Sequence, residues 1–251
     1  MASDRPLLYS SLAGWFHLLT HPKDYEEEAE IYRREFMDAC AFTPRTLLEL
    51  GSGGGNNASH LKKHFEITLT DLSPEMLALS KTINPELEHF EGDMRTLRLG
   101  RQFDLVFAHD AVSYLRDEAS VRAAVQTAWE HLAPGGVALF CPDDLAEQWA
   151  ESIDSGGHNG DDGRGLRYVA WAHRRGVEAP AYSYDFAYLL READGSMSVL
   201  HDRHICAAHP RDTWLKAFTD SGFEVEMKEL RHSEVEAGST FHFVAVKPGN
   251  G

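Results

Sequence analysis

Short apolar runs alternate along this chain with segments in which apolar residues recur every three or four positions. Runs of the first kind predict buried strands, and the second pattern predicts amphipathic helices. Strands are expected at residues 46–50, 67–71, 87–91, 103–109 and 137–141. Helices are expected over residues 24–40 and 117–132, the second ended by Pro134-Gly135-Gly136. The alternation predicts an α/β fold with βαβ units around a mainly parallel sheet.

The pattern changes after residue 142. Residues 154–165 read DSGGHNGDDGRG, a composition that predicts an exposed loop because it cannot bury an apolar face. Segments of strand character follow at 166–174, 182–191 and 196–207, and the Asp194-Gly195 step between the last two predicts a hairpin. Residues 211–221 then show a helical pattern that Gly222 ends, and strands are expected at 223–230 and 240–246. We therefore expect an antiparallel insertion in an otherwise alternating fold.

The length of 251 residues and the hydrophobic content of 43% suit one α/β domain with an elaboration. Within it, residues 1–44 are expected to form a helical segment over the ligand site, and residues 45–142 a Rossmann-like core. Residues 143–207 are expected to form a lid loop and an antiparallel β cap. Residues 208–251 would then supply the helix and terminal hairpin that complete the core.

The composition of this chain argues against some classes of binding partner. Its 40 acidic and 24 basic side chains leave a formal net charge of -16, which argues against a nucleic-acid partner because it would repel a phosphate backbone. Apolar stretches fall short of the roughly 18 residues that a membrane span needs. Cys40, Cys141 and Cys206 form no Cys-x-x-Cys pair, which favours a reducing cytoplasm over a disulfide or zinc framework. We expect a cytoplasmic monomer or homodimer with a small-molecule partner.

No metal site is expected from the histidines or from the acidic loop. His201 and His204 lie three apart in a predicted strand, so their side chains point to opposite faces and cannot share a metal. A surface position is expected for each. The acids of residues 154–165 lack the ordered ligand positions of a calcium loop.

Candidate chemistry begins where residues 46–50 run into a glycine-rich turn, Gly51-Ser52-Gly53-Gly54-Gly55, and a helix from about Asn56. Glycine tolerates positive φ and lets a ligand approach the backbone, so this turn can cradle a nucleoside. Gly53-x-Gly55-x-x-Ala58 fits the dinucleotide fingerprint, in which a pyrophosphate sits on the helix N-terminus. Glu49-x-Gly51-x-Gly53-x-Gly55 fits a methyltransferase pattern instead, in which the ligand carries a methionine moiety. A purely structural turn is the third interpretation.

Acidic residues downstream bear on that choice, because they fall near the carboxyl ends of successive strands, where α/β sheets bind ligands. Asp71 ends the second strand and can accept two hydrogen bonds from a ribose diol, in either class of enzyme. Asp93 follows the third strand and can accept from an adenine amino group while Met94 packs on the ring. A second acid after the third strand favours adenosine bound on this side over a dinucleotide. A turn or helix-cap role is the alternative for Asp93.

Five segments resemble class I S-adenosylmethionine-dependent methyltransferases in the family's order: LELGSGGG, TLTDLSPEML, FEGDM, FDLVFAHDAVSYL and LAPGGVALF. The resemblance covers about residues 45–142 and continues more loosely on both sides. It implies a Rossmann-like seven-stranded sheet whose last strand is antiparallel. The segment HDRHICAAHPRDTWLKAFTDSGFEVE is similar to amino-sugar N,N-dimethyltransferases and to glycine- and sarcosine-type N-methyltransferases. This similarity implies that the antiparallel insertion caps the acceptor pocket.

The same resemblance implies a set of cofactor-binding residues. It places the methionine end of S-adenosylmethionine against Gly51 and Gly53, with His109 beside it and Tyr25 at the cofactor carboxylate. Tyr25 also lies on the apolar stripe of its helix, so a core position is the alternative for it. Ribose falls on Asp71, and adenine on Asp93 and Met94. The predicted set is completed by Glu49 and Leu72.

The implied reaction is methyl transfer from S-adenosylmethionine to a small molecule, with nitrogen slightly preferred over oxygen. A sulfonium already makes its methyl group electrophilic, so the protein mainly has to position the acceptor. The candidates for removing a proton are His109, Asp110, Tyr114, Asp143, Asp144 and His173. Adjacent Asp143 and Asp144 are alternatively read as helix caps. An NAD(P)-dependent Rossmann oxidoreductase and a non-catalytic cofactor-binding protein are the competing functions.

Overall fold

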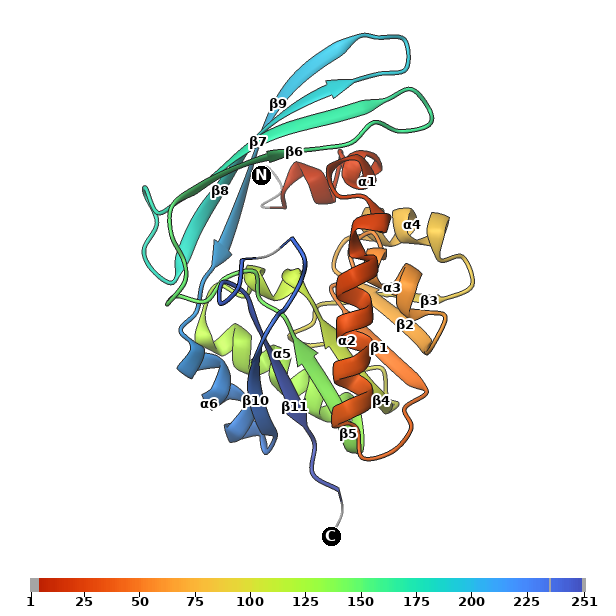
Figure 1. Ribbon diagram of the computed structural model, residues 1–251, viewed down its shortest axis with the longest axis vertical. Helices are drawn as coiled ribbons and strands as arrows, with labels where there is room; N and C mark the ends of the chain where they lie inside the picture. Colours follow the sequence, from red (N-terminus) through yellow and green to blue (C-terminus); the bar gives the residue numbers. More distant parts are fainter. Residues whose placement is uncertain (1–4, 235, 250–251) are drawn as a thin grey trace.

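The strands expected before residue 142 join the last two strands in one seven-stranded sheet in the computed structural model, which describes residues 5–234 and 236–249 (Figure 1). Its members are β1 (Thr46–Leu50), β2 (Glu66–Asp71), β3 (Glu88–Glu91), β4 (Phe103–Ala108), β5 (Leu132–Phe140), β10 (Glu224–Glu229) and β11 (Phe241–Val246). The strand order is β10-β11-β5-β4-β1-β2-β3. Only β11 runs antiparallel to its neighbours, β5 and β10. The predicted Rossmann-like sheet with an antiparallel last strand is confirmed.

Helices cover both faces of this sheet. The α-helices are α1 (Phe16–Leu19), α2 (Glu26–Ala39), α3 (Asn56–Leu61), α4 (Pro74–Ile83), α5 (Glu118–His131) and α6 (Arg211–Ser221). The short 3-10 helices are η1 (Leu7–Tyr9), η2 (Ala13–Trp15), η3 (Pro22–Tyr25) and η4 (Asp110–Tyr114). Buried side chains of α2 and α3 pack on one face, and those of α5 and α6 on the other. Among the described residues, no helix is both long and apolar enough to cross a bilayer.

A second sheet of four antiparallel strands covers the top of the molecule in Figure 1. Its strands, in sheet order, are β6 (Ser152–Gly156), β7 (Gly165–His173), β8 (Ala181–Arg191) and β9 (Met197–Ala207). The predicted hairpin is confirmed, because Arg191 pairs with Met197 across the Asp194-Gly195 turn. One face of this cap sheet packs on apolar side chains of the N-terminal segment, residues 7–19, which lies between the two sheets.

Two boundaries differ from the sequence-based expectation. The exposed loop expected at residues 154–165 begins as a strand, because β6 pairs along β7 at the edge of the cap sheet and needs no buried face there. The fifth strand begins at Leu132 and not at residue 137, since Leu132 pairs with Phe103 before the ladder shifts register. The Pro134-Gly135-Gly136 step therefore lies in an irregular part of β5, while α5 still ends at His131.

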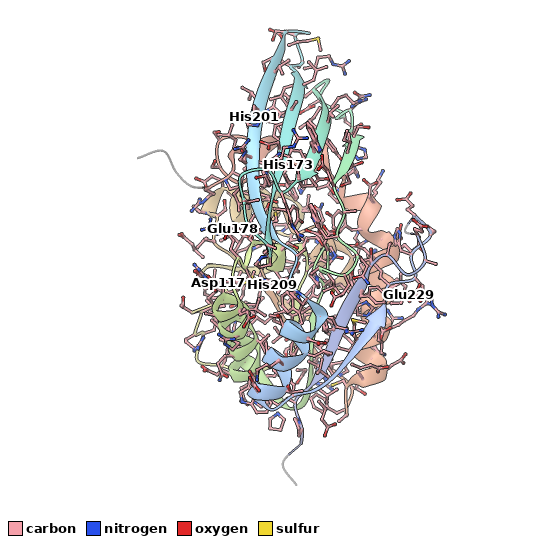
Figure 2. All side chains as sticks on the ribbon, turned by 90° about the vertical axis from the view of Figure 1, so that its left-hand side faces the viewer. Asp117, His173, Glu178, His201, His209 and Glu229 are labelled. Atoms are coloured by element: carbon pink, nitrogen blue, oxygen red, sulfur yellow. The ribbon has the colours of Figure 1, made fainter. Side chains whose placement is uncertain are left out.

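Asp117 offers a direct stability test, because its Oδ1 atom accepts a 2.7 Å hydrogen bond from the Ser120 amide and caps α5 (Figure 2). We expect Asp117→Ala to lower the free energy of unfolding by about 1 kcal/mol, since the amide loses its partner at the helix start. Urea denaturation measures the change. Asp212→Ala is the matched control, because Asp212 stands in the first turn of α6 without a side-chain cap there. An equal loss in both variants would contradict the capping role.

Candidate active site

The glycine turn has the backbone geometry that its sequence predicts. Gly51, Gly53 and Gly55 have φ values of 72°, 53° and 77°, in the left-handed region that favours glycine. A Cβ on Gly51 would lie 2.4 Å from Ala111 Cβ and 2.9 Å from Met94 Cε, so a side chain there has no room. The turn thus brings the end of β1 against the loops that follow β3 and β4.

Asp71, at the end of β2, holds this turn in place. Its Oδ2 atom accepts a 2.8 Å hydrogen bond from the Gly53 amide, and its Oδ1 atom accepts one of 2.8 Å from the Ser73 amide. Burial raises the pKa of the Asp71 carboxyl, although these amides oppose the change. Each carboxylate oxygen retains a further lone pair, so the group can accept from a ligand hydroxyl as well.

The other residues expected around adenosine differ in their exposure and in the contacts that their side chains already make. Leu72 follows Asp71 and is 54% exposed. The Met94 side chain packs against Gly51. The Asp93 carboxylate pairs with the Arg95 guanidinium and accepts from the Arg95 amide, and this side-chain hydrogen bond holds its pKa below the usual range. In the ligand-free protein Asp93 is therefore a turn acid, and an adenine amino group would have to share it with Arg95.

Glu49 stands out as a buried carboxyl without a partner. It is 3% exposed, and its Oε2 atom has no hydrogen-bond partner within the described chain. Burial raises its pKa to about 8; His109 opposes that shift, whereas Asp71 and Glu28 add to it. A carboxyl in this position is poised to ionise when a cationic ligand arrives, because an isolated buried charge is otherwise unfavourable.

His109 lies beside Glu49, at the carboxyl end of β4. Its Nδ1 atom is 3.0 Å from Asp110 Oδ1, and its Nε2 atom is 3.6 Å from Glu28 Oε1 and 3.2 Å from the Tyr32 hydroxyl. Burial by itself lowers the pKa of His109, but Asp110 and Glu28 outweigh it and raise the value to about 10. The imidazole is therefore a cation at neutral pH. The ring of Tyr25 lies edge-on to it at 6.3 Å.

A cavity of about 220 Å³, which we call the acid cavity, opens beside His109. It is lined by Tyr25, Glu28, Tyr32, His109, Asp110, Cys141, Pro142, Asp143, Leu230, Thr240, Phe241 and His242. Asp110 and Asp143 follow the neighbouring strands β4 and β5 and share a hydrogen bond. Burial, and the repulsion of Asp110, raise the pKa of Asp143 well above its usual range. The pKa of Asp110 is lowered despite burial because His109 pairs with it. One proton is therefore held on the Asp143 side of this pair.

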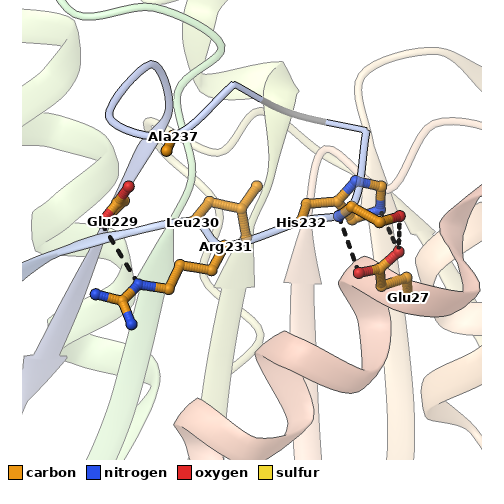
Figure 3. Close-up of a pocket in the computed structure, with 7 residues that line it drawn as sticks. Glu27, Glu229, Leu230, Arg231, His232 and Ala237 are labelled. Atoms are coloured by element: carbon orange, nitrogen blue, oxygen red, sulfur yellow. Dashed lines mark hydrogen bonds and ion pairs between the residues drawn. The ribbon is translucent and has the colours of Figure 1, made fainter.

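A larger hollow of about 540 Å³ adjoins the acid cavity at Leu230 (Figure 3). It lies between the start of α2 and the connection from β10 to β11. Its basic side chains are engaged with acids: Arg231 Nε is 3.5 Å from Glu229 Oε2, and His232 Nε2 is 3.6 Å from Glu27 Oε2. The acids of this hollow are therefore paired with its own basic side chains.

The remaining predicted candidates separate into two groups. Asp144 accepts a 3.2 Å hydrogen bond from the Tyr182 hydroxyl of the cap, and burial raises its pKa. The alternative of helix caps for Asp143 and Asp144 is wrong, because no helix begins at these residues. Tyr114 closes η4 and contacts Tyr9 and His204. Asp144 and Tyr114 therefore both contact strands of the cap sheet.

His173 lies apart from them. Its Nε2 atom is 2.8 Å from Asp185 Oδ2, on the face of the cap sheet that points away from the N-terminal segment (Figure 2). His201 contacts the same carboxylate at 2.7 Å and is largely exposed. His204, in contrast, points inward and is 2% exposed, so the expected surface position is wrong for it. Strand alternation separates the two histidines as expected, but the cap sheet has a covered inner face that the sequence pattern did not identify.

Several residues of the site were missed in the sequence. Glu28 lies three positions after Tyr25, the N-cap of α2, and four before Tyr32, so helical periodicity places all three on one side. This spacing is the local signal that places Glu28 beside Tyr25 and Tyr32. Tyr9, Asp202 and His204 meet through tertiary packing of segments nearly 200 residues apart, which no local pattern predicts.

Comparison with known proteins gives a consistent family assignment. Residues 47–136 match a family model described as a methyltransferase domain. The chain is 32% identical over 215 residues to the dTDP-3-amino-3,4,6-trideoxy-alpha-D-glucopyranose N,N-dimethyltransferase of Streptomyces venezuelae, covering 82% of this chain and 86% of the relative. It is 31% identical over 195 residues to a trans-aconitate 2-methyltransferase of Methylobacterium radiotolerans, covering 75% and 72%.

Solved structures agree with these relatives. The crystal structure of DesVI from Streptomyces venezuelae superimposes with a TM-score of 0.82 at 26% identity, covering 96% of this chain and 98% of that one. CalS10 from Micromonospora echinaspora, described as an amino pentose methyltransferase with S-adenosylmethionine bound, superimposes with a TM-score of 0.75 at 26% identity, covering 89% and 91%. The similarity spans the cap as well as the seven-stranded sheet.

Proposed function

The chain belongs to the class I S-adenosylmethionine-dependent methyltransferases, and we propose that it methylates the amine nitrogen of a small acceptor of the amino-sugar class. The observation that carries this proposal is the acid cavity at the carboxyl ends of β4 and β5, which Glu28, Asp110 and Asp143 line together with His109. His109 balances the charge of Asp110, and the other two carboxyl groups can ionise when a cationic acceptor enters, so the cavity suits an ammonium.

The residues around the turn fit S-adenosylmethionine. Gly51 and Gly53 leave the backbone of the turn open to a ligand, and Asp71 has lone pairs free for ribose hydroxyls. The unpartnered Glu49 carboxyl suits the positive charge of the methionine end. We assign Tyr25 and His109 to the same end, and Asp93, Met94 and Leu72 to the adenine side. Bound there, S-adenosylmethionine supplies an electrophilic methyl group.

The protein then has to hold an amine nitrogen in line with that group. Positioning of this kind can contribute on the order of 7–11 kcal/mol to lowering a barrier. The Asp110 carboxylate can orient an ammonium by hydrogen bonds, because carboxylates accept strongly from charged donors, and Asp143 can join it by releasing its proton when the ammonium arrives. We propose that the core of residues 45–142 holds the cofactor while residues 143–207 cover the acceptor.

The relatives support an amine more than a carboxylate acceptor. Among them, the Streptomyces venezuelae enzyme is named for an amino sugar and CalS10 is described as an amino pentose methyltransferase. The trans-aconitate enzyme is named for a tricarboxylate. A tricarboxylate would meet repulsion from the Asp110 carboxylate and would oppose ionisation of Glu28 and Asp143, whose pKa values burial already raises, whereas an ammonium would be attracted. We place the reaction in the cytoplasm, in a monomer or homodimer; all three cysteines are free thiols.

A panel of matched acceptors tests this proposal. Purified protein is incubated with S-adenosylmethionine and, separately, 3-amino-3-deoxy-D-glucose, its dTDP derivative, D-glucose and trans-aconitate, and products are read by mass spectrometry. We expect methylation of at least one amine and none of D-glucose or trans-aconitate. Asp143→Asn is expected to raise KM for the amine, whereas Asp154→Asn, on the exposed β6 strand, leaves it unchanged. Transfer to trans-aconitate but to neither amine would overturn the proposal.

A further inference from the structure

A chain of four hydrogen-bonded side chains runs from the space between the two sheets into the cap. The Tyr9 and Tyr114 hydroxyls are 3.0 Å apart, and the Tyr114 hydroxyl is 2.6 Å from His204 Nδ1. His204 Nε2 is 3.1 Å from Asp202 Oδ2. The two phenols are half-buried, whereas His204 and Asp202 are 2% and 5% exposed. The accessible end of the chain is therefore the phenols, and the closed end is the carboxylate.

The Asp202 end of this chain fixes the direction of its hydrogen bonds at His204. A carboxylate can only accept, so the proton of the imidazole lies on Nε2 and points at Asp202. His204 Nδ1 then carries a lone pair and accepts from the Tyr114 hydroxyl. The Tyr114 hydroxyl is also within donating distance of the Tyr9 oxygen, so its single proton can go to Tyr9 or to His204, but not to both at once. A hydroxyl, an imidazole and a carboxylate are thus arranged so that a proton can move toward the imidazole.

Asp202 is fixed by backbone groups of the N-terminal segment. Its Oδ1 atom accepts from the Leu7 amide and its Oδ2 atom from the Leu8 amide, both at 2.9 Å. The titratable groups facing His204 come from four elements: Tyr9 from η1, Tyr114 from η4, Tyr184 and Tyr188 from β8, and Asp202 and Cys206 from its own strand β9. Asp202 is the nearest acid among them, so an imidazolium formed there would be paired.

The phenols lie beside the acid cavity. Tyr114 ends the same 3-10 helix, η4, that Asp110 begins, and the Ser113 hydroxyl before it accepts from the Asp143 amide at 3.1 Å. Burial raises the pKa of Tyr9 and of Tyr114, and Asp143 adds to both shifts. Both phenols therefore keep their protons at neutral pH, and they can pass a proton on without forming a stable phenolate.

We propose that Tyr9 and Tyr114 accept the proton of an ammonium acceptor and pass it to His204, with Asp202 as the positioning residue that fixes the imidazole. This inference rests on the proposed amine methylation. The ammonium N–H bond breaks, its proton goes to a phenol oxygen, and the phenol proton goes to His204 Nδ1, which leaves a neutral amine and an imidazolium paired with Asp202. The amine lone pair then forms the N–C bond as the C–S bond breaks, with its electron pair left on sulfur. After product release the proton returns to solvent by the same path.

The test compares His204→Gln with His201→Gln, three residues away on the same strand. His201 also pairs with a carboxylate, Asp185, but on the outer face of the cap. Rates are measured with the panel amine that the wild type methylates fastest, across the pH range in which that amine loses its proton. We expect His204→Gln to lower kcat on the order of 10²-fold at acidic pH, with little change in KM, because a general base typically contributes about 10²–10⁴-fold. The loss should shrink as pH rises, since the amine then arrives neutral. His201→Gln should match the wild type.

Tyr114→Phe interrupts the same chain without touching Asp202, and it decides the question if His204→Gln does not fold. It should show the same pH-dependent loss, and the double variant should be no slower than either single variant. In the wild type, ¹⁵N spectra of labelled histidine identify the ring nitrogen of His204 that carries the proton, and the relay requires a lone pair on Nδ1. A loss of rate that does not change with pH, no loss at all, or a proton on Nδ1 would overturn the relay. A wild-type protein that methylates none of the amines would count against the proposed function instead.

Discussion

Asp71→Ala is expected to weaken S-adenosylmethionine binding by roughly 100-fold or more. The Asp71 carboxylate accepts from the Gly53 and Ser73 amides, and in the proposed complex it also accepts from the ribose. Each hydrogen bond to a charged group contributes about 1.5–3 kcal/mol, so the loss of two bonds to the ribose weakens binding by about 3 kcal/mol or more. A loss of about 2.8 kcal/mol corresponds to a 100-fold higher dissociation constant. Isothermal titration calorimetry measures the change.

The sheet contains a matched control for this variant. Asp104 Oδ2 accepts from the Arg45 and Thr46 amides at 2.8 and 3.0 Å, so it performs the same structural task at the opposite end of β1. Asp104→Ala should reduce stability while leaving the dissociation constant for S-adenosylmethionine within about twofold. If both variants bind the cofactor equally well, Asp71 has no part in binding it.

Glu49→Gln is expected to remove a pH dependence of cofactor binding. The Glu49 pKa of about 8 means that the wild type must release a proton when a cationic ligand binds. Affinity should therefore rise by up to about tenfold per unit as the pH increases from about 6 toward 8. In Glu49→Gln that slope should flatten, because the amide does not titrate. Glu88→Gln, on the exposed edge strand β3, should keep the wild-type slope.

The stability of the ligand-free protein should depend on pH in the opposite sense. Folded Glu49 keeps its proton up to about pH 8, whereas a glutamate in an unfolded chain ionises near 4.3, so the folded state binds more protons in between. The contribution of Glu49 to stability is complete below the unfolded value and is lost as pH rises through the folded one. Urea denaturation should show Glu49→Gln losing less stability than the wild type over this interval. Parallel curves would contradict the buried, unpartnered carboxyl.

The core of the fold was predictable because its signals are local. Apolar runs set the positions of β1, β2 and β4, and Gly222, with a φ of 98°, ends α6 where the sequence places its stop. The edge strand β6 was not predictable, because an edge strand with both faces exposed carries no apolar alternation. The early start of β5 was not predictable either, because it includes a Pro-Gly-Gly step, which normally ends a helix or a strand.

Some residues of the candidate site were likewise predictable from the sequence, and others were not. The residues of the turn and of the strand ends, such as Gly51, Asp71 and His109, occupy positions that a parallel sheet determines from its topology. The relay of Tyr9, Tyr114, His204 and Asp202 depends on the inner face of the cap sheet, and only the docked N-terminal segment distinguishes that face from the outer one. A single sequence does not carry that information, which is why His204 was expected at the surface.

The most direct test of this account is a crystal structure of the protein with S-adenosylhomocysteine, the demethylated cofactor. We predict the methionine end against Gly51 and Gly53 with its ammonium near Glu49, the ribose hydroxyls on Asp71, and the sulfur facing the acid cavity of Asp110 and Asp143. A cofactor bound away from the glycine turn, or a sulfur directed away from that cavity, would contradict it.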